Sequence, residues 1–191
     1  MIDLKGKQLI LASRSPRRQE LLKGLHLDFE IRIKETEEDF PADMPADQVA
    51  PFLSEKKAKA FESELNEGEL VLASDTVVVL EGKILNKPSD SAEAKEMLKS
   101  LSGNVHEVMT SITILSSEKM VTQQDIAKVT FKGLSDEEMD FYITHFQPFD
   151  KAGAYGIQEW IGFIGVEKLE GSFYTVMGLP VHLVYRVLNE W

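Results

Sequence analysis

Two observations on the sequence predict an α/β fold. Residues 9–12 are apolar and are followed by a serine turn and by Pro16, which predicts a buried strand, a turn and a helix in direct succession. Residues 70–80 are apolar apart from three polar residues at 74–76, as expected for strands buried on both faces. Strands of that kind belong to sheets that helices cover, so we expect strands and helices to share one core.

Length and composition allow one domain or two small lobes that share a cleft. The chain has 191 residues, of which 43% are hydrophobic and 28% charged, and it has no cysteine. A disulfide framework, a thiolate metal site and a cysteine nucleophile are therefore excluded. The longest apolar runs fall far short of the roughly 20 residues that a membrane span needs, and the first residues form no signal-like pattern. We expect a single domain over residues 1–191, located in the cytoplasm and without a membrane partner.

The charge pattern favours a small anionic ligand. A formal net charge of −11 argues against a nucleic-acid partner, because nucleic-acid-binding proteins present a basic face to the phosphates. The cations nevertheless occur in groups, at Arg14, Arg17 and Arg18, at Lys56, Lys57 and Lys59, and at Lys87 and Lys151. We therefore predict a positive cleft in an otherwise negative molecule.

The first helix begins with features of a phosphate site. Pro16 suits the first helical position and Ser15 the N-cap, so unpaired backbone N–H groups and the positive end of the helix dipole face the turn. Arginines at the same place, Arg17 and Arg18 among them, favour an anion. The alternative is a set of solvated arginines at an ordinary helix start.

An acidic loop follows the first helix and a short strand. The helix is expected to end near Lys23, and residues 29–33 alternate apolar and polar side chains as a strand does. Residues 35–39 then carry four carboxylates. They form either a solvated surface loop or, if phosphates bind nearby, a site where one carboxylate holds a divalent ion, since Mg²⁺ is usually bound through one or two carboxylates and substrate phosphates.

A helix is predicted from about Asp47 to Leu65. Pro51 is expected to delay its regular part to about Ala50. The lysine-rich segment 56–60 would normally form the exposed basic face of such a helix.

Three polar residues, Ser74, Asp75 and Thr76, are expected to divide the stretch 70–80 into two core strands. Polar side chains at such a place are costly unless they are satisfied, and the carboxylate most of all. Asp75 either bonds backbone amides in a turn or stands at a strand end facing a cleft, where open α/β sheets bind ligands. The residues alone leave both interpretations open.

The remainder of the chain continues the alternation of strands and helices. Pro88 holds Lys87 in an extended segment, where its ammonium can meet a phosphate, and His106 is interpreted as a structural strand residue. Capping patterns and periodicity predict helices at about 90–101 and 135–145 and a closing helix after residue 180. Alternation and apolar runs predict strands at about 84–86, 105–115, 124–131 and 163–166.

Several segments, in order along nearly the whole chain, resemble the motifs of the Maf family of nucleoside triphosphate pyrophosphatases, once described as septum-formation inhibitors. The most specific are Ser13-x-Ser15-Pro16-Arg17-Arg18-x-Glu20-Leu21-Leu22 and Asp150-Lys151-Ala152-Gly153-Ala154-Tyr155-Gly156-Ile157-Gln158. Ser74-Asp75-Thr76, Asn86-Lys87-Pro88 and Leu101-Ser102-Gly103-x-x-His106 also match, with Ser74 in place of the family's alanine. The resemblance implies a mixed, elongated sheet flanked by helices, with two lobes around a central cleft, as in the related inosine triphosphate pyrophosphatase-like fold.

The resemblance also implies an activity and a set of site residues. The reaction is hydrolysis of a nucleoside triphosphate between the α and β phosphorus atoms. The implied catalytic residues are Asp75, Lys57 and Lys87, and the implied substrate-binding residues are Ser13, Ser15, Arg17, Arg18, Thr76 and Gln158. A divalent cation, Mg²⁺ or Mn²⁺, would be held by Glu38 and Asp75. The acidic loop departs from the family's Asp-Glu-Thr element, so Glu37 is the second choice for Glu38.

Three positions imply the substrate. The subgroup that acts on dTTP and UTP has the residues found here as Arg17, Thr76 and Gln158, and an amide offers the donor and the acceptor that a pyrimidine edge requires. The family also suggests a homodimer. The alternative function is a nucleotide-sensing regulator of septum formation that binds nucleotides without turnover.

Overall fold

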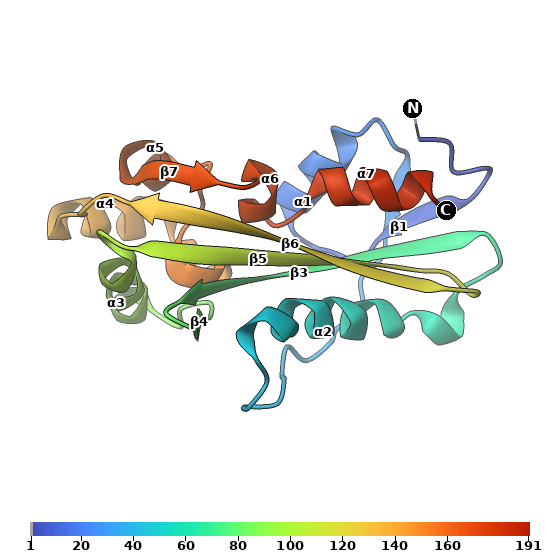
Figure 1. Cartoon of the computed structure of the whole chain (residues 1–191), viewed down its shortest axis with the longest axis horizontal. Helices are drawn as coiled ribbons and strands as arrows, with labels where there is room; N and C mark the ends of the chain where they lie inside the picture. The colour runs from blue at the N-terminus through green and yellow to red at the C-terminus, as the bar shows by residue number, and fades with distance from the viewer. Residues whose placement is uncertain (1) are drawn as a thin grey trace. The chain divides into compact units, whose positions relative to one another are not determined.

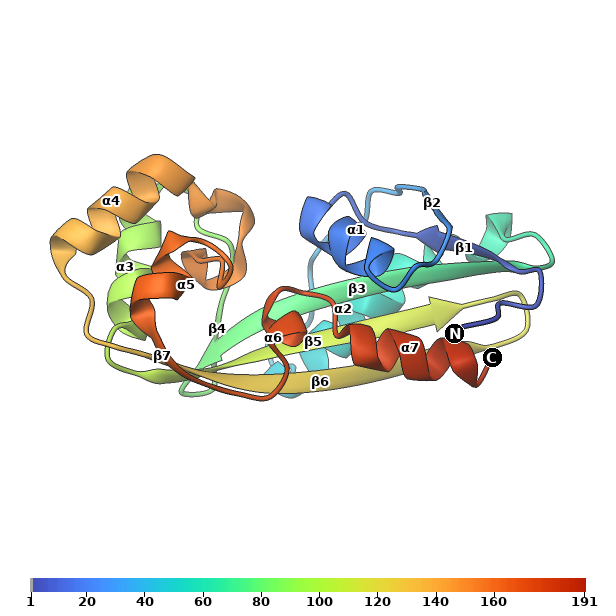
Figure 2. The same cartoon turned by 90° about the horizontal axis from the view of Figure 1, so that it is seen from above.

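A computed structural model describes residues 2–191, and the chain divides into two compact units (Figures 1 and 2). Unit 1 contains the residues up to Asp75, Thr110–Asp125 and Gly178–Trp191, and unit 2 contains Thr76–Met109 and Ile126–Met177. Three long strands contribute residues to both units. None of the helices described between residues 2 and 191 is long and apolar enough to cross a membrane.

The strands form a mixed sheet. Hydrogen-bonded neighbours follow the order β2-β1-β3-β5-β6-β7, and β4 pairs with β3. Strand β1 is parallel to β2 and β3, whereas β4 is antiparallel to β3 and β7 is antiparallel to β6. The strands are β1 (Gln8–Leu11), β2 (Phe29–Ile31), β3 (Glu69–Leu80), β4 (Lys83–Leu85), β5 (Val105–Leu115), β6 (Met120–Phe131) and β7 (Val166–Glu170).

The helices lie between the strands in the sequence. The α-helices are α1 (Pro16–Lys23), α2 (Ala46–Lys59), α3 (Ser91–Leu101), α4 (Asp136–Phe146), α5 (Trp160–Gly165), α6 (Phe173–Val176) and α7 (Val181–Asn189). Three short 3₁₀ turns are η1 (Glu62–Glu64), η2 (Pro148–Asp150) and η3 (Ala152–Ala154). The mixed α/β class expected from the sequence is thereby confirmed.

Unit 1 has helices on both faces of its strands. Leu9 and Leu11 of β1 and Leu70 and Leu72 of β3 pack with apolar residues of α1 and α7. On the opposite face, the side chains at alternate positions of the same strands pack with residues of α2 and the turn after it, among them Ala58 and Phe61. Figure 1 shows α2 on one side of the strands and α1 and α7 on the other. This double cover explains why residues 70–73 carry no polar side chain.

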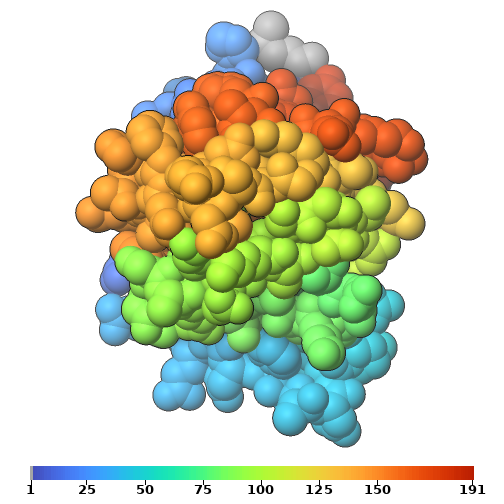
Figure 3. All heavy atoms as spheres, turned by 90° about the vertical axis from the view of Figure 1, so that its left-hand side faces the viewer, coloured from blue at the N-terminus to red at the C-terminus, as the bar shows by residue number. Residues whose placement is uncertain are grey.

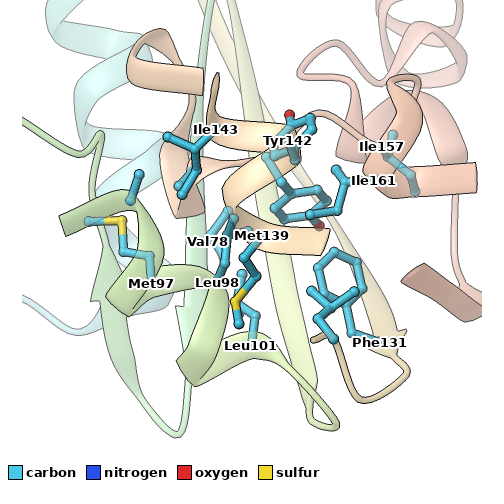
Figure 4. Close-up of a cluster of buried hydrophobic side chains, with 14 of the residues drawn as sticks. Val78, Met97, Leu98, Leu101, Phe131, Met139, Tyr142, Ile143, Ile157 and Ile161 are labelled. Carbon is cyan, nitrogen blue, oxygen red and sulfur yellow. The ribbon is translucent and has the colours of Figure 1, made fainter. Parts of the chain in front are cut away.

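A large apolar core lies in unit 2. Val78, Phe131 and other strand residues pack with Leu98 of α3, Tyr142 of α4 and Ile161 of α5, and the labelled side chains in Figure 4 point toward one another. In the space-filling view, atoms of α3 (green) and α4 (orange-yellow) lie against one another (Figure 3). The segment 151–159 therefore packs against the apolar core of its own unit.

The largest difference from the sequence expectation is the continuity of β3. A break at Ser74–Thr76 was expected, but one strand runs from Glu69 to Leu80, so Asp75 lies inside a strand and not at a strand end. The polar residues are tolerated there because each finds partners. The Ser74 hydroxyl donates to the carbonyl of Gly178 (3.1 Å), and Asp75 accepts from Lys57.

Helix α2 also differs from the expectation. It begins at Ala46, ahead of Pro51, and ends at Lys59 instead of continuing to residue 65. Proline has no N–H to donate to the carbonyl of Asp47, four residues earlier. The amide of Gln124 donates to that carbonyl instead (3.1 Å), so the helix passes through Pro51 without losing a hydrogen bond at Asp47.

The strand predicted at 163–166 is wrong. Residues 160–165 form α5, with Ile161 buried and Phe163 78% exposed, and the strand β7 begins at Val166. A run of six residues that includes two glycines is too short for periodicity to separate a helical turn from a strand. The other predicted elements are present: the caps at Ser15, Asp90 and Ser135 are occupied, and Glu81 and Gly82 form the expected turn with positive φ values of 50° and 78°.

Candidate active site

The start of α1 has the predicted cap. The Ser15 hydroxyl accepts a hydrogen bond from the backbone N–H of Arg18 (3.4 Å), and Pro16 occupies the first helical turn. The hydroxyl of buried Ser13 in turn accepts from the N–H of Ser15 (3.2 Å). These two serines fix the turn that carries Arg17, which is half-buried, at the positive end of the helix.

Arg18 connects α1 to the residue before Asp75. Its Nε donates to the carbonyl of Gly178 (2.8 Å) and its Nη1 to the carbonyl of Ser74 (2.8 Å). Burial lowers the pKa of the Arg18 guanidinium, and the charge of Asp75 opposes that shift. Arg18 therefore holds the carbonyl of the residue before Asp75 with one donor and Gly178 with another, and substrate binding by Arg18 stays a prediction.

Asp75 and Glu38 share one ammonium group. Asp75 is buried, with 6% of its surface exposed, and its Oδ1 accepts a short hydrogen bond from the Nζ of Lys57. The same Nζ donates to Oε1 of Glu38 (2.8 Å). Lys57 therefore lies between a strand carboxylate and a loop carboxylate, and both carboxylates are one hydrogen bond away from the same nitrogen atom.

A buried chain of hydroxyl groups seats α2, and with it Lys57, on the strands. The Ser54 hydroxyl lies 3.1 Å from Oγ of Ser111 and 2.8 Å from Oγ1 of Thr113, both on β5. Oγ1 of Thr113 also lies 3.1 Å from Oγ1 of Thr122. The Thr122 hydroxyl in turn donates to Oε1 of Glu55 on α2 (3.0 Å). These side chains fix the axial position of the helix, because sliding it by one residue would leave buried hydroxyls unpaired. Sequence reasoning missed this role, since serine and threonine in strands carry no distinctive pattern.

The acidic loop is attached to basic residues by three separate ion pairs. Glu35 pairs with Arg14 (3.2 Å), Glu38 with Lys57 (2.8 Å), and Asp39 with Lys56. Glu38 thus contacts the same lysine as Asp75, and its choice over Glu37 as a metal ligand stays a prediction. Lys56 and Lys59, which were counted among the clustered cations, are each paired with a carboxylate, Lys59 with Glu55 (3.3 Å).

The residues around Lys57 fit a divalent cation that also binds phosphates. Among residues 2–191, no three His, Asp or Glu side chains are grouped so that they could hold a metal ion by themselves. Glu38 and Asp75 give two hard oxygen donors at one place, which is the number that Mg²⁺ commonly takes from a protein when substrate phosphates and water complete its shell.

The other predicted site residues belong to unit 2. Thr76 directly follows Asp75 in β3, Lys87 is exposed just beyond β4, and Gln158 is half-buried after η3. The carbonyl of Asn86 accepts from the N–H of Gly153 (3.2 Å), so the segment that carries Lys87 is bonded to the one that leads to Gln158. The approach of Lys87 and Gln158 to Asp75 stays a prediction.

His106 is a buried strand residue, as predicted, but only one of its ring nitrogens is satisfied, because its Nδ1 is buried without a hydrogen-bond partner among the described residues. It is buried, its Nε2 lies 2.7 Å from the hydroxyl of Tyr155, and its ring packs edge-on against Phe131 and Tyr155. Burial lowers the pKa of His106 to about 4, so the ring is neutral near pH 7.

Comparison with known proteins gives the family. The family described as Maf-like protein matches residues 8–191, which is nearly the whole chain. The chain belongs to the Maf family. It is 50% identical to the dTTP/UTP pyrophosphatase of Flavobacterium johnsoniae, over 97% of this chain and 96% of the relative. It is 45% identical to the protein of the same name from Porphyromonas gingivalis, over 100% of this chain and 98% of the relative. It is also 45% identical to the protein of that name from Bacteroides thetaiotaomicron, over 98% of each chain.

A solved structure supports the fold assigned to this Maf protein. The Ham1 protein of Staphylococcus aureus matches with a TM-score of 0.53 and 18% identity, over 96% of this chain and 99% of that one. At that identity the likeness concerns the fold alone, and it agrees with the architecture that the family resemblance implied.

Proposed function

We propose that this Maf protein hydrolyses dTTP and UTP to the monophosphate and pyrophosphate. The observation that carries the proposal is the contact of Lys57 with both Asp75 and Glu38, in a chain that shares up to half its residues with relatives named dTTP/UTP pyrophosphatase. A buried carboxylate beside an ammonium group is suited to activate water next to a phosphate, because the cation stabilises charge that develops during the reaction.

The chain's own residues divide the work of the reaction. The capped start of α1, with Ser13, Ser15 and Arg17, binds phosphate oxygens through backbone N–H groups and the guanidinium. Arg18 holds the backbone at Ser74, so that Asp75 keeps its position. Lys87 supplies a further positive charge to the phosphates.

Asp75 acts on the attacking water. Its carboxylate takes up a proton while the water oxygen bonds to phosphorus and the α–β anhydride bond breaks, which releases pyrophosphate and leaves the monophosphate. Lys57 keeps the Asp75 carboxylate oriented and, once phosphates arrive, can share its donors with them. A bound Mg²⁺ or Mn²⁺, held by Glu38 and Asp75, would withdraw charge from the phosphates.

Base selection is assigned to Arg17, Thr76 and Gln158. The amide of Gln158 offers a donor and an acceptor to the edge of thymine or uracil. A site that bonds a polar base edge rejects bases that leave its groups unpaired, which gives stronger discrimination than an apolar pocket.

The test is pyrophosphate release from a panel of nucleotides with Mg²⁺ or Mn²⁺. We expect dTTP and UTP to be hydrolysed with the highest kcat/KM, and activity to disappear when the divalent ion is chelated. Preference for 7-methyl-GTP or ITP would overturn the substrate assignment and keep the reaction class. Nucleotide binding without pyrophosphate release would instead favour a nucleotide-sensing regulator of septum formation.

Two further expectations from the family belong to this proposal. The protein is expected to form a homodimer and to work in the cytoplasm, where its nucleotide substrates are found. Light scattering on the purified chain tests the first expectation: the mass should be twice the 21.5 kDa of the monomer.

A further inference from the structure

The residues that lead to Gln158 form a turn of unusually close contacts. The N–H of Glu159 donates to the carbonyl of Gly156 (3.0 Å), which closes the turn. A Cβ atom at Gly156 would lie 2.8 Å from Cδ of Glu159 and 3.1 Å from Nε2 of Gln158. The ends of the Gln158 and Glu159 side chains therefore both lie over the α-carbon of Gly156, and a side chain at position 156 would displace them.

Glu159 is held in this turn by two buried partners. The hydroxyl of Tyr142, on α4, donates to Oε2 of Glu159, and the Nζ of Lys151 lies 3.2 Å from Oε1. The Tyr142 oxygen also accepts from the N–H of Gly156 (3.0 Å). The bonds form a closed circuit from Gly156 through Tyr142 to Glu159 and back along the chain, all within unit 2.

Burial strengthens this circuit. Tyr142 is fully buried and Lys151 is 8% exposed. Burial, together with the neighbouring carboxylate of Glu159, raises the pKa of Tyr142 far above its ordinary value, so the phenol keeps its proton and remains a donor. The preceding residue, Tyr155, is anchored independently by its hydrogen bond to His106 (2.7 Å). The turn is thus fixed at both of its ends.

We infer that Tyr142 and Glu159 are positioning residues that hold the amide of Gln158 in the orientation that selects the base. The inference deepens the proposed function and rests on it. A glutamine amide can present either its oxygen or its NH₂ group to a ligand after half a turn about its last bond. Thymine offers an acceptor where cytosine offers a donor, so a freely turning amide would accept both bases.

A fixed turn restricts that freedom. The Gln158 amide packs on Gly156, whose position depends on Tyr142, and the turn is closed by Glu159. Neither Tyr142 nor Glu159 needs to touch the nucleotide. Their loss should therefore weaken base selection and nucleotide binding and spare the phosphate chemistry around Asp75.

The experiment measures kcat and KM for pyrophosphate release from dTTP and from dCTP. Tyr142→Phe is compared with Gln158→Ala as the reference for lost base reading. The matched control is Asp140→Asn, which alters another side chain of α4 whose partner is Lys95 (2.7 Å). We expect Tyr142→Phe to raise KM for dTTP about tenfold, to change kcat by less than about twofold and to reduce the preference for dTTP over dCTP about tenfold, as Gln158→Ala does. Asp140→Asn should change none of these values.

Glu159→Gln tests the same circuit conservatively. Its amide oxygen can still accept from Tyr142, whereas its charge on Lys151 is lost, so the preference for dTTP should fall by less than in Tyr142→Phe. A merely structural role would lower the rates with dTTP and dCTP by one common factor. That result, with Gln158→Ala losing preference, would overturn the inference.

Failure of the proposed function has a separate signature. If the wild type hydrolyses dTTP and Gln158→Ala keeps the preference for dTTP over dCTP, Gln158 does not select the base. The inference is then overturned as well. If the wild type hydrolyses no nucleotide, the proposed function fails, and calorimetric binding of dTTP and dCTP decides the inference. A binding preference for dTTP that Tyr142→Phe removes supports it, and equal binding of both nucleotides by the wild type overturns it.

Discussion

Each unit places a lysine between two carboxylates, and this lysine is half-buried in unit 1 and buried in unit 2. In unit 1 the Lys57 side chain, 17% exposed, contacts Asp75 and Glu38; in unit 2 the Lys151 side chain, 8% exposed, contacts Asp150 and Glu159. In both places one carboxylate is well covered and the other is largely open to water. Each arrangement combines one lysine, one aspartate and one glutamate, although the covered carboxylate is the aspartate in unit 1 and the glutamate in unit 2.

The two arrangements differ in the further partners of the covered carboxylate. Glu159 also accepts from Tyr142, which is itself bonded to a backbone N–H, so the charge in unit 2 belongs to a closed network. Asp75 lies in a strand whose backbone is held by Arg18, and its ammonium partner is shared with a loop residue, Glu38. We infer that the further partners of each lysine–carboxylate group, and not the ion pair itself, distinguish the proposed catalytic site in unit 1 from the hydrogen-bonded network in unit 2.

The largest effect on kcat is expected for Asp75→Asn, in the lysine site of unit 1. The substitution keeps the shape of the side chain and removes the proton acceptor, so we expect kcat for dTTP to fall roughly 10³-fold, within the usual range for a lost general base. Steady-state pyrophosphate release measures the effect, and thermal unfolding checks that the fold is intact.

The matched control for Asp75→Asn is Asp150→Asn, which removes the open carboxylate beside Lys151 in unit 2. Its kcat should stay within about twofold of the wild type. Equal losses in the two variants would mean that the two lysine sites are not distinct in function, and wild-type rates in Asp75→Asn would remove Asp75 from the mechanism.

The second prediction concerns the buried side chain of His106 in unit 2. The pKa of His106 is about 4 in the folded chain and 6.5 when the group is unburied. Between these two pH values the unfolded chain binds a proton that the folded chain does not, so the free energy of unfolding decreases as the pH falls from about 6.5 to about 4. The full difference is about 3 kcal/mol.

His106→Gln isolates that contribution. Glutamine can still bond the hydroxyl of Tyr155 but does not titrate, so the variant should lose about 3 kcal/mol less than the wild type between pH 7 and pH 4 in denaturant unfolding. Identical pH dependence in both proteins would show that His106 takes up its proton in the folded state.

Local signals explain why much of unit 1 was predictable. The cap at Ser15 and the proline after it depend on neighbouring residues alone, and they gave the correct start of α1. The assignment of Lys57 and Asp75 to one site came only from the family resemblance, because the two residues are 18 positions apart and no local rule connects them.

Two of the misses, at Asp75 and at Glu159, have this same physical origin. Asp75 was expected to break β3, since a carboxylate between core strands is costly by itself, but Lys57 and the Arg18 contact at Ser74 offset that cost from distant parts of the chain. Glu159 was not singled out at all. Its partner Tyr142 is 17 residues away, and nothing in the sequence around Glu159 marks it as half-buried.

The smallest predicted effect compares two serine caps, one in each unit. Ser135 caps α4 in a complete capping box with Glu138, and Ser15 caps α1 at the proposed phosphate site. Each loss of a capping hydroxyl should lower the free energy of unfolding by about 1 kcal/mol. Ser135→Ala should leave kcat and KM unchanged, whereas Ser15→Ala should also raise KM for dTTP several-fold, because the N–H groups that it orients are the ones proposed to bind phosphate. Unchanged KM in Ser15→Ala, at equal loss of stability, would reduce the start of α1 to an ordinary helix end and move the phosphate site elsewhere.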